Sequence, residues 1–133
     1  MNLVRNTFTK DERLNNVSLI SNLFKQGDSM FVYPFKVIYK VNSIEKTPPV
    51  QLLLVAPKKG FKRAVDRNQI KRLVREAYRT HKHELWSSQT LKGNQLLLGL
   101  VYVGKTILPY SEIEKKLILI LQRLSKKDEE NIG

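Results

Sequence analysis

The residues of this chain that could do chemistry gather in one basic segment, residues 58–82. That segment holds ten of the chain's 24 Lys and Arg residues and only two acids, Asp66 and Glu76. It therefore accounts for +8 of the net charge of +12. Ammonium and guanidinium groups at this density bind phosphate, so the pattern predicts nucleic acid or another polyanion as the partner.

The spacing of the arginines predicts that they share one face of a helix. A helix that turns by about 100° per residue brings Arg72, Arg75 and Arg79 into one stripe, while Ile70 and Val74 point away toward a core. Arg grips phosphate oxygens with a planar fork, which favours a structured sugar-phosphate backbone. A membrane-surface helix would need its apolar face for lipid. A merely solvated basic face is the alternative, although such faces usually mix both signs.

Gly60 lies in the loop Lys58–Arg63 that precedes this helix. A glycine there would let backbone amides approach an anion near the helix N-terminus, and an ordinary connecting turn is the alternative. The loop lacks the Gly-x-x-x-x-Gly-Lys-Ser/Thr pattern of a P-loop. It is therefore predicted only to contact phosphate.

Catalytic and metal-binding side chains are not predicted. The acids are scattered, so no carboxylate pair suits a two-metal nuclease, and the absence of Cys excludes thiolate chemistry. His81 and His83, the only histidines, would point about 200° apart on a helix and are not expected to share a metal. The sequence thus predicts a binding protein with no metal ligand of its own.

Length and composition predict a single domain over residues 1–133. The chain is 41% hydrophobic, which suits one ordinary core. It shows no apolar stretch of membrane-spanning length and no signal peptide, so a cytoplasmic location is expected. Residues 126–133 are predicted to form a flexible, solvated tail.

The elements that must position the basic segment alternate between helix and strand. Residues 16–26 predict a helix that ends at Gly27, and residues 66–86 a second helix with Asp66 as its N-cap. A capping box of Ser111 and Glu114 would open a last helix that ends near Leu124. Strands are predicted over residues 31–41, 50–57 and 95–103. The order αββαβα indicates an α+β fold, a small mixed β-sheet with helices packed on one face and the other face free for a ligand.

The segment Asp66–Arg79, DRNQIKRLVREAYR, together with the preceding PKKGFKRAV, resembles the protein subunit of bacterial ribonuclease P. The hallmark of that family is an Arg-Asn-Arg helix followed by an Ile-Lys-Arg-Leu-Ile-Arg run. The likeness extends to RLNNVSLISNLFKQGDS, residues 13–29, and to the order of the elements. Two positions depart from the pattern, because Gln69 stands where the second Arg belongs and Ile20 replaces a commonly aromatic residue.

The resemblance implies a protein cofactor that binds a catalytic RNA and the 5′ leader of precursor tRNA and aids endonucleolytic removal of that leader. In that family the RNA subunit carries the chemistry and holds Mg²⁺, and the fold has an unusual left-handed βαβ crossover. No membrane and no small-molecule substrate are expected. A structural, ribosomal-type RNA-binding protein is the alternative.

Carried over by position, the resemblance implies two sets of site residues. The set expected to bind RNA is Lys58, Lys59, Lys62, Arg63, Arg67, Asn68, Lys71, Arg72, Arg75 and Arg79. The set expected to line a leader cleft between the first helix and the sheet is Phe24, Lys36, Ile38 and Lys40. Plain core packing is the alternative for Phe24, and ordinary solvent exposure is the alternative for Lys36 and Lys40.

Overall fold

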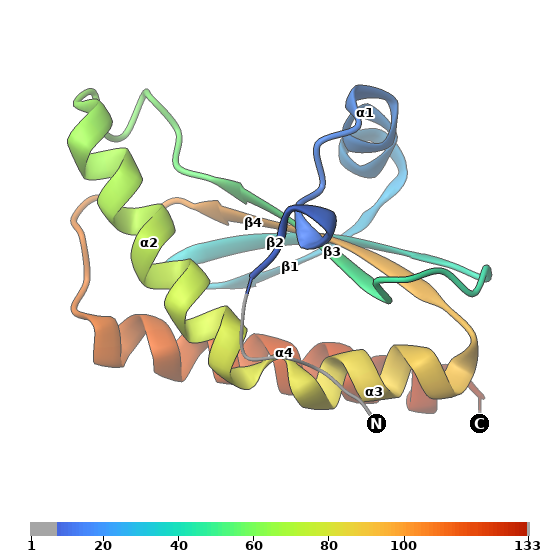
Figure 1. Cartoon of the computed structure of the whole chain (residues 1–133). Coiled ribbons are helices and arrows are strands. Elements are labelled where there is room, and N and C mark those ends of the chain that lie inside the picture. Colours follow the sequence, from blue (N-terminus) through green and yellow to red (C-terminus); the bar gives the residue numbers. More distant parts are fainter. Residues whose placement is uncertain (1–7, 133) are drawn as a thin grey trace.

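The computed structural model describes residues 8–132, with side chains through residue 126. It is a mixed α+β fold (Figure 1), and the predicted fold class is confirmed. The strands are β1 (Asp28–Val32), β2 (Phe35–Asn42), β3 (Val50–Val55) and β4 (Gln95–Tyr102). The helices are the 3-10 turn η1 (Lys10–Glu12), α1 (Val17–Gln26), α2 (Ala64–His81), α3 (His83–Lys92) and α4 (Tyr110–Ile132).

The four strands form one mixed sheet in the order β1-β2-β4-β3. The pairs β1–β2 and β2–β4 are antiparallel, whereas β3 and β4 are parallel. Parallel neighbours need a long crossover, and here that connection contains α2 and α3. The left-handed sense of the crossover stays a prediction.

The strand predicted over residues 31–41 is in fact a hairpin. The chain turns at Tyr33 and Pro34, and Asp28–Val32 pairs back on Phe35–Tyr39. Pro34 has no amide hydrogen to donate to a strand partner, which explains why the strand breaks there. The sheet therefore gains an edge strand, β1, that the sequence pattern did not reveal.

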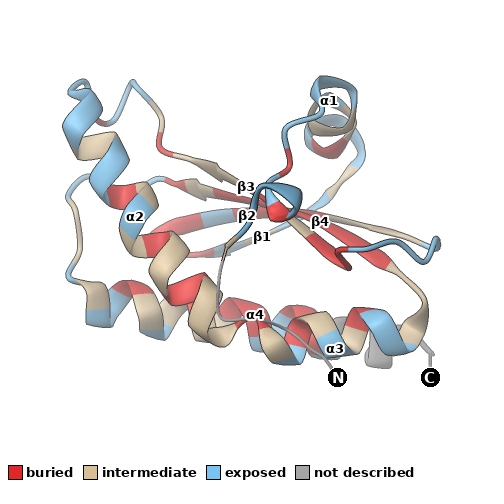
Figure 2. Ribbon diagram, viewed as in Figure 1, coloured by how far each residue is buried: buried red, intermediate tan, exposed pale blue. Residues whose placement is uncertain are grey.

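Three of the four α-helices cover one face of the sheet. The main core brings together Phe35, Val37 and Tyr39 of β2 with apolar side chains of α2, α3 and α4. Seven of the eight residues of β4 are buried (Figure 2), because this strand lies inside the sheet and has helices over both of its faces. The sequence predicted that helices cover one face of the sheet, and this is that face.

The first helix lies on the opposite face (Figure 1), so the prediction that this face is free of helices was wrong for the part that α1 covers. A smaller core there packs Leu14 and Leu23 against Ile38 and Leu97. The helix ends at Gln26 as predicted, with Gly27 as its C-cap. A Cβ at position 27 would lie 2.5 Å from the Leu23 carbonyl oxygen and 3.0 Å from that of Tyr39. Glycine is therefore required by the close approach of α1 to the sheet.

The boundaries of the middle helix differ from the prediction. It begins at Ala64 with Arg63 as N-cap, so Asp66 is not the cap but a first-turn residue. It ends at His81, and a separate helix, α3, follows Lys82 and ends at Lys92, with Gly93 at a φ of +68° as its C-cap. Lys82 interrupts the helix while its side chain is buried against Glu12, a contact that no local pattern encodes.

The last helix also departs from the prediction at both ends. It begins at Tyr110, so Ser111 lies inside the first turn and the expected capping box with Glu114 does not form. The Glu114 carboxylate instead lies 2.9 Å from His81 Nε2 and accepts a hydrogen bond of 3.4 Å from the Tyr110 hydroxyl. The helix continues past Leu124 to Ile132, so the backbone of the predicted tail is helical through residue 132.

Candidate RNA-binding surface

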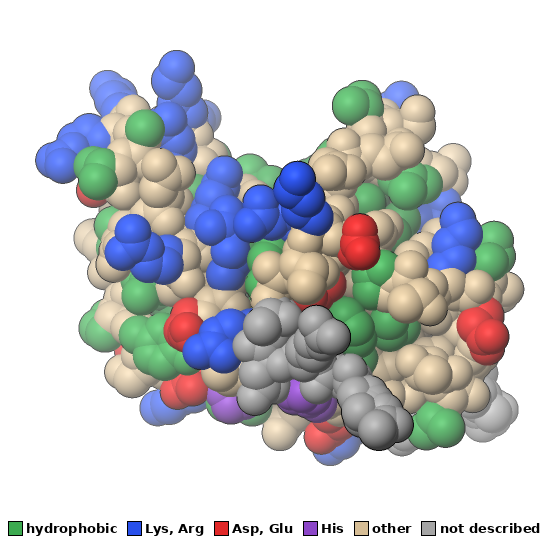
Figure 3. All heavy atoms as spheres, in the orientation of Figure 1, with side chains coloured by type: hydrophobic (Ala, Val, Ile, Leu, Met, Phe, Trp, Pro, Cys, Tyr) green, Lys and Arg blue, Asp and Glu red, His purple; other side chains and the backbone are tan. Residues whose placement is uncertain are grey.

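All ten residues predicted to bind RNA lie on α2 or on the loop that leads into it. Six of them are exposed and the other four are half-buried. The opposite side of the helix is buried through Ile70, Val74 and Ala77, so the predicted division into a cationic face and a core face is confirmed. Lys and Arg side chains gather over this part of the surface (Figure 3). The exposed members are Lys58, Lys59, Lys62, Arg63, Asn68 and Arg72.

Three of the arginines have partners within the protein. Arg67 Nη1 donates to the carbonyl oxygens of Phe61 and Lys62, each at 2.8 Å, so Arg67 holds the loop in place. Arg79 pairs with the Glu76 carboxylate at 2.6 Å, and this hydrogen bond raises the pKa of Arg79. Arg63 lies 3.7 Å from Asp66. These contacts assign Arg67 a positioning role and leave Arg79 with much of its charge offset.

The structure does not support the role predicted for Gly60. The amides of Gly60 and Phe61 both donate to the Pro57 carbonyl oxygen at 3.1 Å. A Cβ at position 60 would meet only that oxygen, at 3.8 Å, which is ordinary contact. The loop is therefore a hydrogen-bonded turn that presents lysine side chains, and its glycine meets no steric demand.

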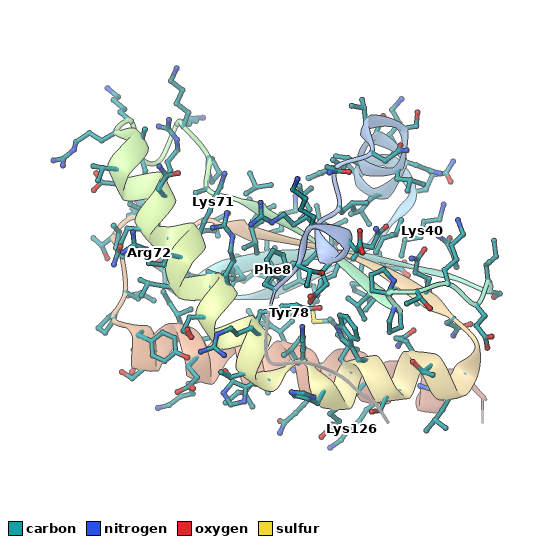
Figure 4. The ribbon with its side chains drawn as sticks, in the orientation of Figure 1. Phe8, Lys40, Lys71, Arg72, Tyr78 and Lys126 are labelled. Carbon is teal, nitrogen blue, oxygen red and sulfur yellow. The ribbon has the colours of Figure 1, made fainter. Side chains whose placement is uncertain are left out.

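Three cations converge where α2 faces the N-terminal segment. Arg13, Lys71 and Arg75 line a cavity of about 260 Å³ together with the Asn15 amide and the apolar side chains of Leu52 and others. Figure 4 shows Lys71 on the side of α2 that faces this segment. Within residues 8–126, no carboxylate lies within 4.0 Å of these three cations. Burial, and then the positive charge of Arg13, lower the pKa of Arg75. Such a site gains from a bound oxyanion, because the anion relieves the repulsion.

Arg13 is a cation of this cavity that the sequence pattern did not single out. It reaches the cavity because the N-terminal segment is anchored at several points. The Lys82 ammonium lies 2.7 Å from Glu12, with both side chains almost fully buried, and Arg13 stacks 5.4 Å from the centre of the Phe8 ring. The one hint in the sequence was that Arg13 opens the stretch that resembles the ribonuclease P family.

The contacts that hold the N-terminal segment extend to aromatic side chains of the helices α2 and α3. The Phe8 ring stands edge-on to Tyr78, with centroids 6.0 Å apart (Figure 4). Trp86 Nε1 donates to the Tyr78 hydroxyl at 3.0 Å, and burial raises the pKa of that hydroxyl, which keeps it protonated. The Lys82 ammonium lies 4.6 Å above the Trp86 ring. Position 13 is thus linked through Phe8 to Tyr78 of α2, and its neighbour Glu12 is bound to Lys82 between α2 and α3.

The four residues predicted to line a leader cleft divide into three environments. Phe24 on α1 is 47% exposed and Lys36 on β2 is exposed, so both are open to a ligand. Lys40 is half-buried, and its Nζ donates to Gln26 Oε1 at 3.5 Å. Ile38 was wrongly placed in the cleft lining: it is 5% exposed because α1 packs on it, and it belongs to the smaller core.

Neither a metal-binding cluster nor a helix able to cross a membrane occurs among the described residues. Among these residues, no three His, Asp or Glu side chains are grouped so that they could hold a metal ion. No described helix combines the length and the apolar character needed to cross a membrane.

Comparison with known proteins finds relatives of similar sequence and a solved structure of similar fold. The ribonuclease P protein component of Porphyromonas gingivalis is 44% identical over 77 residues, which cover 58% of this chain and 56% of that protein. The one from Chlorobium phaeobacteroides is 35% identical over 107 residues, 74% of this chain and 73% of that protein. The solved RNase P protein of Thermotoga maritima shares the fold, with a TM-score of 0.67 at 24% identity over 84% of this chain and 96% of that one.

The match to the Porphyromonas protein thus spans little more than half of that relative's length. The family model called Ribonuclease P, by contrast, matches residues 8–125. This range includes every strand, the cationic helix α2 and the anchored Arg13. The chain therefore belongs to the ribonuclease P family.

Proposed function

We propose that this chain is the protein subunit of a ribonuclease P ribonucleoprotein in the cytoplasm. It binds the catalytic RNA and the 5′ leader of precursor tRNA and aids the hydrolytic, endonucleolytic cleavage that gives mature tRNA 5′ ends. The RNA subunit carries the chemistry and holds the Mg²⁺. The observation that supports this best is the cationic face of α2, where Arg72 is exposed and where Lys71 and Arg75 line a cavity with Arg13. No carboxylate of the described residues lies within 4.0 Å of these four cations.

Electrostatics explain how such a protein would help a ribozyme. A catalytic RNA and an RNA substrate repel each other through their phosphates, and divalent cations normally screen that repulsion. A fixed row of guanidinium and ammonium groups does the same at one place on the surface. The benefit should therefore be largest when Mg²⁺ is scarce.

The direct test is cleavage of precursor tRNA by the ribonuclease P RNA at low Mg²⁺, with and without this protein. We expect cleavage at the 5′ end of the mature tRNA to become faster when the protein is added. Binding of the RNA without faster cleavage would support the ribosomal-type, purely structural alternative. Cleavage by the protein alone would contradict the assignment of the chemistry to the RNA.

Substitution of Arg72 tests the phosphate contacts of the cationic face. Arg72 is exposed, so Arg72→Ala should leave the fold intact. It should lower the slope of log affinity against log salt by about 0.7 to 0.9, the value of one lost phosphate contact. The measurement is a salt titration of binding to the catalytic RNA, and an unchanged slope would show that Arg72 faces only water.

Substitution of Phe24 tests the leader cleft. Stacking of a base on an aromatic ring contributes about 1 to 3 kcal/mol, and Phe24 is only 47% exposed, so Phe24→Ala should weaken binding by about 1 kcal/mol. The loss should be confined to tRNA precursors that carry a leader. An equal loss on mature tRNA, measured in parallel, would point to a folding defect.

A further inference from the structure

Two aromatic rings stand in solvent at the tip of the β1–β2 hairpin. Phe31 is 62% exposed and Tyr33 is 50% exposed, and their ring centroids lie 6.4 Å apart with planes inclined by 57°. The rings of Phe35 and Tyr102, by contrast, form an edge-on pair inside the main core. The hairpin pair adds little to the core, so its exposure calls for another explanation.

The strand register places Phe31 on the face of the sheet that α1 only partly covers. Phe31 pairs with Lys36, Lys36 with Val101, and Val101 with Val55. Directly paired residues point to the same side of a sheet, so these four side chains form one row across all four strands. We call it the open row.

Helix α1 covers mainly the neighbouring rows, although Val101 of the open row also packs against the smaller core. Leu23 packs with Ile38 and Leu97, and its Cδ2 would lie 3.5 Å from a Cβ at Gly99, next to Ile38 in the sheet. In the open row, by contrast, Phe31 and Lys36 are exposed while Val55 and Val101 are half-buried. The open row is therefore an accessible strip beside α1, and the surface is hollowed between α1 and the N-terminal end of α2 (Figure 3).

The charges around the open row select a polyanion with flat apolar groups. On this face of the four strands the ionisable side chains are Lys36 and Lys40, and α1 adds Lys25 and no acid. The row leads from the hairpin to β3, which continues into the cationic loop Lys58–Arg63. Aromatic rings beside cations form the usual surface for binding single-stranded nucleic acid.

We infer that Phe31 and Tyr33 form a base-stacking platform for single-stranded RNA, at the far end of a path that begins at the cations before α2. Three strand spacings of about 4.8 Å separate β1 from β3, a span of about 14 Å that holds roughly four stacked nucleotides at 3.4 Å each. This inference rests on the proposed function and extends it, because the platform engages leader nucleotides beyond those at Phe24.

The experiment compares precursor tRNAs with a short and a long leader, bound to the complex of this protein with the ribonuclease P RNA. Phe31→Ala and Tyr33→Ala should each weaken binding of the long-leader precursor about 5- to 10-fold, the lower range for one lost base stack. Binding of the short-leader precursor should not change. Phe31→Trp should restore the affinity. Leu91→Ala is the matched control, because Leu91 is 88% exposed on α3 and should alter neither precursor.

The outcomes separate this inference from the proposed function. If wild-type protein accelerates cleavage and Phe31→Ala binds both precursors normally, the platform is refuted while the proposed function stands. Failure of the wild-type protein to accelerate cleavage refutes the function itself. A wild-type protein that sediments as a dimer while Phe31→Ala sediments as a monomer would show that the rings join two copies of the chain, which also overturns the inference.

Discussion

Replacing Glu12 by glutamine should lower the free energy of unfolding by about 3 to 5 kcal/mol, because the substitution leaves a buried ammonium without its carboxylate. The Lys82 and Glu12 side chains are 1% and 4% exposed and lie 2.7 Å apart. The other carboxylate oxygen of Glu12 accepts hydrogen bonds from the Thr9 amide and hydroxyl, at 2.8 and 3.1 Å. Glutamine preserves the shape and can keep the Thr9 contacts, so the loss reports on the charge. Urea denaturation followed by circular dichroism measures it.

A double-mutant cycle tests the cause. Lys82→Met should be similarly destabilising, since it buries the Glu12 carboxylate without the ammonium, whereas Glu12→Gln combined with Lys82→Met should cost less than the sum of the two. Additive losses, or a Glu12→Gln protein as stable as the wild type, would show that the pair contributes little to stability.

Removing all three cations of the cavity should weaken binding to the catalytic RNA on the order of 100-fold at about 0.1 M salt. The variant carries Arg13→Gln, Lys71→Gln and Arg75→Gln. Each lost phosphate contact lowers the log–log salt slope by about 0.7 to 0.9, so the slope should fall by about 2 to 3. Removing like charges that repel one another should not destabilise the fold, and a salt titration of binding together with a thermal melt measures both effects.

A second triple variant is the control for the loss of net charge alone. Lys46→Gln, Lys115→Gln and Lys126→Gln remove the same charge from exposed positions in the β2–β3 loop and on α4. Lys126 lies on the helical layer, away from Lys71 and Arg72 (Figure 4). This variant should keep most of the affinity and of the salt slope. If both triple variants lose affinity equally, the cavity is not a specific site.

The local sequence was sufficient for the cationic helix. Helical periodicity separated Ile70 and Val74 from Arg72 and Arg75, and the structure buries the first pair and leaves Arg72 exposed and Arg75 half-buried. The alternation of Phe35, Val37 and Tyr39 likewise identified the core face of β2. These features depend on residues a few positions apart, and local patterns report them well.

Features that depend on distant parts of the chain were not visible. Arg13 joins the cavity only because Glu12 is anchored on Lys82, and that same buried contact accompanies the break between α2 and α3. Ile38 was predicted to line the cleft because the sequence alone does not show that α1 packs on it. Pro34 was a local signal for the turn of the hairpin, but the continuous apolar pattern of residues 31–41 led to the prediction of a single strand.

The position of β4 in the sheet has a consequence for biosynthesis. It is the last strand to leave the ribosome, yet it lies between β2 and β3, which do not touch each other. A nascent chain that has released only its first 90 or so residues therefore lacks the strand that joins the two parts of its sheet. Its apolar strands cannot complete the sheet until a strand far along the sequence has emerged. The basic helix emerges before that partner does, so the growing polypeptide is a polycation beside ribosomal RNA before it can fold.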